Sequence, residues 1–261
     1  MPDMRSIWLI ADDFGQAEAI DRGILTLALQ GRISGTSVLV ESPRLVECAG
    51  LLREHKELAR GLHFNLTHVF DKARPGLRQV LLAAYTGRLV ADDLVRAWHQ
   101  QLDRFEKVLQ QVPDYIDGHQ HVHQLPQVRE AMLQVMTQRY GQLLPFRSTL
   151  TKQARGFKAF VIASLGARRL PQQHCMNSDF AGVYGFQGKE FAKKMATWLS
   201  DIADRGLIMC HPGETDEADP LRASRPMELK YLGSEAFNEA CERQKIRLLS
   251  RQDLPVTGFK E

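Results

Sequence analysis

The sequence predicts an α/β fold, an irregular (β/α) barrel of the TIM-like type built as one domain over residues 1–261. Short apolar runs typical of strands alternate with amphipathic patterns typical of helices almost throughout the chain. There are about seven or eight such units, the number that a barrel requires. A chain of 261 residues with 44% hydrophobic and 25% charged residues can also bury one large core.

The predicted strands are short and apolar, and several end at an acid or a histidine. They lie near residues 6–11, 36–40, 59–64, 114–118, 143–147, 178–181, 206–210 and 245–249. Because helical patterns separate most of them, we expect right-handed βαβ units around a parallel sheet. Parallel α/β folds place their chemistry at the carboxyl ends of the strands, so these ends are where functional residues are expected.

The predicted helices have apolar residues at helical spacing and suitable residues at their ends. They lie near residues 17–30, 43–56, 91–111, 125–140, 152–166, 188–204 and 233–244. Gly31 suits the position after the first helix, and Ser42 and Ser234 suit helix caps. Residues 67–90 and 211–232 are predicted to be long loops that shape a pocket.

Composition and motifs exclude several classes of function. A net charge of +3 is too small to indicate nucleic-acid binding, although a pI of 8.7 suits an anionic substrate or lipid surface. The four cysteines are far apart, and neither GxGxxG nor GxxxxGK[ST] occurs, so zinc knuckles and nucleotide cofactors are not expected. No signal peptide or transmembrane segment is recognisable, which predicts a cytoplasmic protein.

The segment Asp117-Gly118-His119-Gln120-His121-Val122-His123 is the most informative motif. In an extended stretch, residues at i, i+2 and i+4 project to one side, so the three histidines could crowd one face. Neutral imidazole is the commonest protein metal ligand, and this favours a divalent metal over a packed core. Core histidines bonded to backbone remain the alternative.

Three other predicted strands also end in acid or imidazole. Asp12 and Asp13 close an apolar run before Phe14-Gly15, and adjacent carboxylates repel unless a positive partner such as a metal lies beside them. His63 and Asn65 share one face of the next such strand, and His211 ends another before a Pro-Gly turn. Each alone could be structural, but four such strand ends are hard to attribute to packing.

Together these motifs resemble the YdjC-like carbohydrate deacetylase family, which includes chitooligosaccharide deacetylases. The matching strings are ADDFG at 11–15, GLHFNLT at 61–67, DGHQHVH at 117–123 and HPGE at 211–214. The resemblance implies a barrel deacetylase that removes acetyl groups from N-acetylated amino sugars, in an oligosaccharide or a glycolipid. It also implies one divalent metal ion, with Mg²⁺ or Zn²⁺ favoured over Mn²⁺ or Co²⁺, and suggests a homodimer.

The resemblance also assigns roles residue by residue. Asp13, His63 and His119 fall on the metal ligands, leaving open positions for water and substrate. Asp12 falls on the general base and His211 on the general acid. The remaining candidates support the ligands or contact substrate, and they are Asp117, Asn65, His121 and His123.

Two other functions remain open at this point. One is a different metal-dependent hydrolase on a similar barrel, such as an amidohydrolase or phosphoesterase. The other is a non-catalytic sugar-binding relative that keeps the fold. A glycosidase is disfavoured because the adjacent Asp12 and Asp13 cannot straddle a glycosidic bond.

Overall fold

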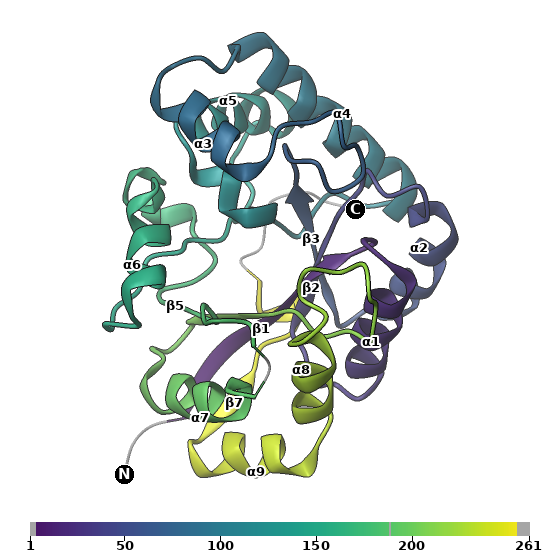
Figure 1. Ribbon diagram of the computed structural model, residues 1–261, viewed down its shortest axis with the longest axis vertical. Helices are drawn as coiled ribbons and strands as arrows, with labels where there is room; N and C mark the ends of the chain where they lie inside the picture. Colours follow the sequence, from purple (N-terminus) through teal and green to yellow (C-terminus); the bar gives the residue numbers. More distant parts are fainter. Residues whose placement is uncertain (1–3, 188, 255–261) are drawn as a thin grey trace.

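The computed structural model describes residues 4–187 and 189–254, and these form a parallel sheet surrounded by helices (Figure 1). The strands are β1 (Arg5–Phe14), β2 (Gly35–Val38), β3 (Ala59–Phe64), β4 (Tyr115–Gly118), β5 (Phe180–Ala181), β6 (Leu207–Cys210) and β7 (Ile246–Leu248). Their order is β4-β3-β2-β1-β6-β5, with β7 paired to β1, and every pairing is parallel. This confirms the predicted α/β barrel type.

The barrel is irregular between β4 and β5. The strand predicted near 143–147 is wrong as a strand, because only Phe146 forms isolated bridges, to Ile116 on one side and Cys175 on the other. Pro145 has no N–H to donate, which prevents a full ladder there. The bridges nevertheless continue the hydrogen bonding from the β4 edge toward the segment that leads into β5.

The helices cover the outside of the sheet, as Figure 1 shows. They are α1 (Glu18–Leu29), α2 (Leu45–Glu54), α3 (Leu77–Tyr85), α4 (Ala91–Leu109), α5 (Val128–Tyr140), α6 (Phe157–Ser164), α7 (Phe191–Asp201), α8 (Arg225–Leu232) and α9 (Glu235–Arg243). All seven predicted helices are present with shifted ends; residue 188, where one was predicted to begin, lies outside the described residues. Among these residues, no helix has the length and apolarity needed to cross a membrane.

Two helices occur where long loops were predicted. Helix α3 lies within 67–90, and its N-cap is Gly76, whose N–H donates to the Gln79 side chain at 2.8 Å. Helix α8 lies within 211–232 and has a proline in its first turn. Both starts suit helices, but the surrounding prolines and glycines resemble loop sequence.

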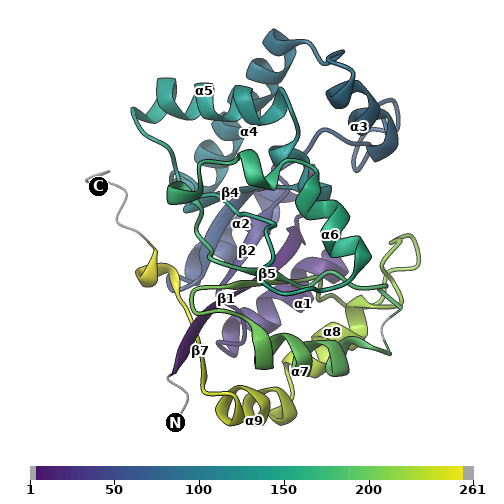
Figure 2. The ribbon, with the colours of Figure 1, turned by 90° about the vertical axis from the view of Figure 1, so that its left-hand side faces the viewer.

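In Figure 2, β1 runs toward the side where α3, α6 and the chain before α8 lie, so these segments surround the strands' carboxyl ends.

Candidate metal and catalytic site

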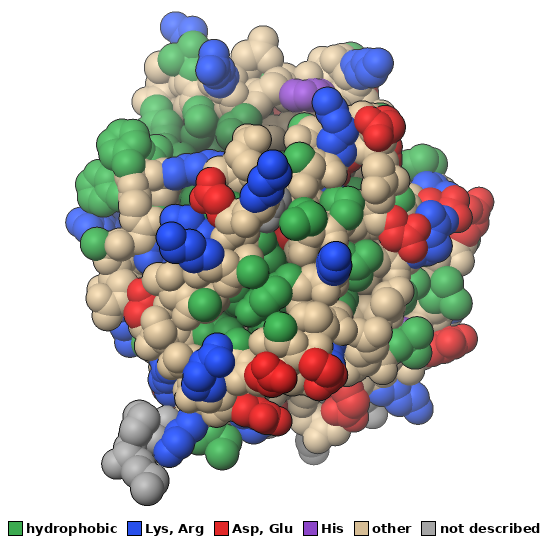
Figure 3. Space-filling view, turned by 60° about the horizontal axis from the view of Figure 1, so that its bottom comes forward, with side chains coloured by type: hydrophobic (Ala, Val, Ile, Leu, Met, Phe, Trp, Pro, Cys, Tyr) green, Lys and Arg blue, Asp and Glu red, His purple; other side chains and the backbone are tan. Residues whose placement is uncertain are grey.

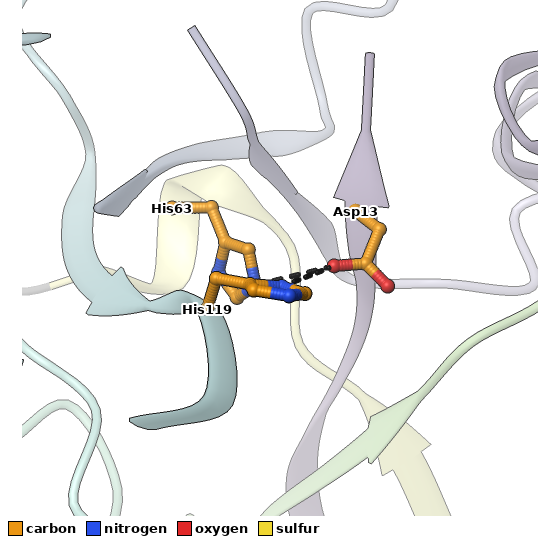
Figure 4. A group of neighbouring side chains, drawn as sticks. All are labelled: Asp13, His63 and His119. Atoms are coloured by element: carbon orange, nitrogen blue, oxygen red, sulfur yellow. Dashed lines mark hydrogen bonds and ion pairs between the residues drawn. The ribbon is translucent and has the colours of Figure 1, made fainter. Parts of the chain in front are cut away.

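Three polar side chains converge at the carboxyl ends of β1, β3 and β4. Asp13 is the last residue but one of β1, His63 is the last residue but one of β3, and His119 directly follows β4. One carboxylate oxygen and one nitrogen from each imidazole lie within 4.8 Å of one another (Figure 4). The structure thus brings together the three residues that were predicted as metal ligands.

An irregularity in β1 explains how two adjacent acids reach one imidazole. Neighbouring residues in a regular strand point to opposite faces of the sheet. Here the register between β1 and β2 shifts between Ala11 and Phe14, and Asp13 has φ of 73°. A bulge of this kind redirects side chains, and such strained backbone concentrates at functional sites. Asp12 and Asp13 therefore both border the His63 imidazole, as their interactions with it show.

The His63 ring is oriented from behind by Asp117. Its Nδ1 lies 2.6 Å from Asp117 Oδ1, and its Nε2 lies 3.4 Å from Asp13 Oδ1. Ser37 donates to the other Asp117 oxygen at 2.6 Å. This arrangement keeps the Nδ1 proton toward Asp117 and leaves the Nε2 lone pair for a cation, a common carboxylate–histidine pairing around metals. Burial lowers the pKa of His63, but the neighbouring carboxylates, Asp117 foremost, outweigh it and raise the pKa to about 10.

Only the first histidine of the His119-Gln120-His121-Val122-His123 run joins this group. His119 Nδ1 lies 3.0 Å from Asp13 Oδ1. The expectation of an extended run with three histidines on one face is wrong, because residues 119–124 form a short 3₁₀ segment with positive φ at Gln120 and His121.

The other two histidines of the run are buried next to the barrel. His121 packs edge-on against Phe180, with ring centroids 5.6 Å apart. His123 Nε2 lies 3.0 Å from the Arg147 carbonyl oxygen. Burial lowers the pKa of both rings, that of His123 to about 4, so both are neutral at physiological pH.

Asp12 is held by a buried guanidinium. Arg147 donates to both Asp12 oxygens at 2.6 and 2.7 Å and approaches Asp117 at 2.5 Å. Burial alone would raise the pKa of Asp12, but Arg147 more than offsets this and the pKa lies below its usual value. Asp12 is therefore a carboxylate at neutral pH, fixed in position and able to accept a proton.

A second buried arginine holds Asp13 from the side away from the histidines. Arg225, in the first turn of α8, donates through Nη2 to Asp13 Oδ2 at 2.8 Å and through Nε to Asp219. The histidines contact the other oxygen, Oδ1. Burial would raise the pKa of Asp13, but Arg225 and the two imidazoles lower it well below its usual value. Asp13 thus presents one ionised oxygen toward the histidines.

His211 directly follows β6 and lies beside Asp12. Its Nε2 is 4.0 Å from Asp12 Oδ2, and its backbone N–H donates to Glu228 at 2.6 Å. The Phe186 ring packs edge-on against the imidazole at 5.2 Å between centroids. Burial is the largest influence on this ring and lowers the pKa of His211 to about 4, so the imidazole is neutral at physiological pH.

Asn65, predicted as a supporting or substrate-contacting residue, forms its side-chain hydrogen bonds with residues outside the group of Asp13, His63 and His119. Its side-chain amide donates to Glu41 at 2.8 Å and to the Thr67 carbonyl at 3.1 Å, and its oxygen accepts from the Thr67 N–H. Asn65 therefore fixes the turn that follows β3, and its amide has no group left for a substrate.

The donor set fits a divalent cation at one place. The group of Asp13, His63 and His119 offers a carboxylate oxygen and two imidazole nitrogens, which suits Zn²⁺ and related ions. A second possible group, Asp12 with His63 and Asp117, is already neutralised because Arg147 binds both of its carboxylates. A cation there would face the guanidinium, so the geometry favours a single metal at Asp13.

Sequence reasoning missed Arg147, Arg225 and Glu228, all of them buried polar residues next to the site. Arg147 could have been predicted from the sequence, because it follows the apolar run at 143–146 just as Asp12 and His211 each follow an apolar run. No sequence pattern pointed to Arg225 and Glu228, since they lie within residues 211–232, which are predicted to form a loop.

Comparison with known proteins agrees with the motifs at these strand ends. The profile of the YdjC-like protein family matches residues 6–243, which is most of the chain. The chain belongs to the YdjC-like family. Within it, the chain is 29% identical over 260 residues to a chitooligosaccharide deacetylase of Serratia marcescens, covering 94% of this chain and 97% of that protein. It is 32% identical over 143 residues to a carbohydrate deacetylase of Danio rerio, covering 48% and 44%.

Solved structures share the fold of this YdjC-like protein. A crystal structure from Enterococcus faecalis, provisionally described as a cellobiose-phosphate cleavage protein, superposes with a TM-score of 0.75 at 21% identity and covers 97% of this chain and 100% of that one. A family 4 acetyl xylan esterase of Clostridium thermocellum, solved with cobalt, superposes with a TM-score of 0.51 at 9% identity, covering 96% and 90%. At these identities the likeness concerns the barrel fold alone.

Proposed function

We propose that this YdjC-like protein is a metal-dependent carbohydrate deacetylase that hydrolyses the N-acetyl group of an N-acetylated amino sugar and releases acetate. One observation carries the proposal: three residues that could hold a metal, Asp13 with His63 and His119, lie beside an ionised carboxylate and a neutral imidazole. The names of the Serratia marcescens and Danio rerio relatives support the same reaction.

The metal would be held by Asp13, His63 and His119, and the donor set is compatible with Zn²⁺, Mg²⁺, Mn²⁺ or Co²⁺. When bound, a divalent ion supplies Lewis acidity to an acetamide carbonyl and makes water a better nucleophile. Asp117 would keep His63 in the tautomer that binds, and Arg225 would keep one oxygen of Asp13 turned away from the ion.

Asp12 and His211 divide the proton transfers. As water attacks the acetamide carbon, Asp12 accepts its proton, because Arg147 keeps this carboxylate ionised and aligned. As the C–N bond breaks, the departing nitrogen needs a proton. His211 is neutral beforehand, so it must gain a proton before it can act as the acid. We infer that this proton comes from Asp12 through one bridging water, because 4.0 Å between Asp12 Oδ2 and His211 Nε2 is too long for a direct hydrogen bond, and that His211 then passes it to the amine. The products are acetate and a free amino sugar.

The direct test is acetate release from metal-stripped protein to which single divalent ions are returned. The substrates would be N-acetylglucosamine, chitobiose and lipid-linked N-acetylglucosamine, and the expected result is metal-dependent acetate from at least one of them. About one metal per chain is expected at saturation. Metal bound without acetate from any substrate would contradict the deacetylase assignment and direct attention to other hydrolase substrates or to a sugar-binding role.

A further inference from the structure

Helix α6 exposes its larger apolar side chains. Phe157, Phe160 and Val161 recur at i, i+3 and i+4 and therefore lie on one face, with Phe157 81% and Phe160 61% exposed. The small side chains Ala159 and Ala163 are the ones that are buried. An ordinary surface helix does the reverse and turns its aromatic residues toward the core. Figure 3 shows hydrophobic side chains protruding at the left edge, where α6 lies in Figure 1.

The chain around α6 is strongly basic. Between Glu130 and Asp179 the sequence contains no Asp or Glu but seven Lys or Arg. Three of these are paired with acids from elsewhere in the fold, and they are Arg139, Arg147 and Arg155. The other four are exposed and form no ion pair within the described residues, and they are Lys152, Lys158, Arg168 and Arg169. Exposed cations without an ion-pair partner, in the same stretch of chain as exposed Phe side chains, complement an anionic, apolar surface.

This surface is adjacent to the candidate active site. Lys158 Nζ lies 4.5 Å from the centre of the Phe186 ring and donates to the Tyr184 carbonyl at 3.1 Å. The Phe186 ring in turn contacts the His211 imidazole. One aromatic residue thus separates α6 from the predicted general acid. In Figure 2, α6 lies on the side toward which the end of β1 points.

We propose that α6 and its four exposed cations form a docking surface for an anionic phospholipid bilayer. Phe157, Phe160 and Val161 enter the interface between headgroups and acyl chains, while Lys152, Lys158, Arg168 and Arg169 lie among anionic headgroups. Docking of this kind brings the candidate active site around His211 to the membrane surface. This second step rests on the proposed function: the favoured substrate is then an N-acetylated sugar attached to a membrane lipid.

Co-sedimentation with vesicles tests the docking surface without any substrate. Wild-type protein is mixed with vesicles of phosphatidylcholine alone or of phosphatidylcholine with 30% phosphatidylglycerol (about a third anionic lipid). We expect binding to the anionic vesicles at least about tenfold tighter than to the neutral ones. The double variant Phe157→Ser/Phe160→Ser and the double variant Arg168→Glu/Arg169→Glu should each lose about tenfold or more of it.

The matched control is Val46→Ser/Leu51→Ser, which removes two exposed apolar side chains from α2. It should bind vesicles like wild type, and circular dichroism should show that every variant is folded. Absence of binding by the wild type, or equal loss in the α2 control, would overturn the proposal. A wild-type dimer that Phe157→Ser/Phe160→Ser dissociates, measured by light scattering, would instead assign α6 to self-association.

Acetate release separates this proposal from the proposed function. The Phe157→Ser/Phe160→Ser variant should deacetylate soluble chitobiose like wild type and lose rate only on lipid-linked N-acetylglucosamine in anionic vesicles. If vesicles bind but no substrate releases acetate, the deacetylase assignment fails while the docking surface stands. Equal rates of the variant and wild type on the vesicle substrate would contradict the lipid-linked substrate class.

Discussion

The two halves of the barrel differ in the regularity of their backbone. From β1 to β4 the strands pair over several residues each, and their carboxyl ends carry Asp13, His63 and the chain leading to His119. From β4 to β6 the sheet continues through single bridges at Phe146 and a two-residue β5. The regular half sets the positions of the ligand group. The irregular half supplies the buried Arg147, and it is followed in the chain by α6, whose larger apolar side chains are exposed.

Replacing Arg147, the residue that the irregular half supplies to the site, should have the largest effect on the free energy of unfolding. Arg147→Met leaves the carboxylates of Asp12 and Asp117 buried without their guanidinium, which should lower the free energy of unfolding by about 3–5 kcal/mol. Urea denaturation of the wild type and the variant measures this change in the free energy of unfolding. The control Arg22→Met removes two exposed ion pairs, with Glu18 and with Glu214, and should cost about 1 kcal/mol or less. Equal effects would show that the buried network contributes little.

A ligand from the regular half should affect metal binding more than folding. His63→Ala removes one of three donors, and we expect metal affinity to fall more than about 100-fold, measured by titration calorimetry and metal content. His99→Ala, a half-buried histidine on α4, is the control and should bind like wild type. An unchanged metal content in His63→Ala would remove this residue from the ligand group.

Metal binding should strengthen as pH rises. The carboxylates around His63 raise its pKa to about 10, so at neutral pH a proton must leave before the imidazole can bind a cation. Apparent affinity should therefore increase by up to about tenfold per pH unit between pH 6 and 8. His121, His123 and His211, with lowered pKa values, are already neutral and add no such dependence. Calorimetry in buffers of different ionisation enthalpy counts the released proton, and constant affinity across this range would contradict the assignment.

The smallest expected effect is on metal affinity, and it follows from replacing Arg225 in α8, a helix that belongs to neither half of the sheet. Arg225→Lys keeps the positive charge but cannot bridge Asp13 and Asp219 together. We expect about tenfold weaker metal binding with little change in folding, since the charge is retained. Metal titration compared with thermal unfolding separates the two effects. Wild-type metal affinity in this variant would mean that Asp13 keeps its orientation without the bridge.

Much of the site was predictable because its residues follow apolar strands. Such runs pointed to the segments that carry Asp13, His63 and His119, since parallel strands bring their carboxyl ends together whatever their separation in sequence. The resemblance to the YdjC-like family then singled out these three residues as the ligand set. The rule about strand ends could also have found Arg147. Two backbone irregularities were not predictable, because they depend on tertiary packing. One is the left-handed conformation of Asp13, which lets two adjacent acids approach the same imidazole. The other is the 3₁₀ segment that directs His119 and His121 to different places. Arg225 lies in a segment whose helix resembles a loop in sequence.

The most direct test of the account compares the adjacent acids. Asp12→Asn and Asp13→Asn are nearly isosteric, and each would be assayed for metal content and for acetate release on the same sample. Asp12→Asn should keep its metal and lose turnover, because the proton acceptor is gone while the ligand group is intact. Asp13→Asn should lose both. Turnover near the wild-type rate in Asp12→Asn, or full metal content in Asp13→Asn, would contradict the division of roles at the end of β1.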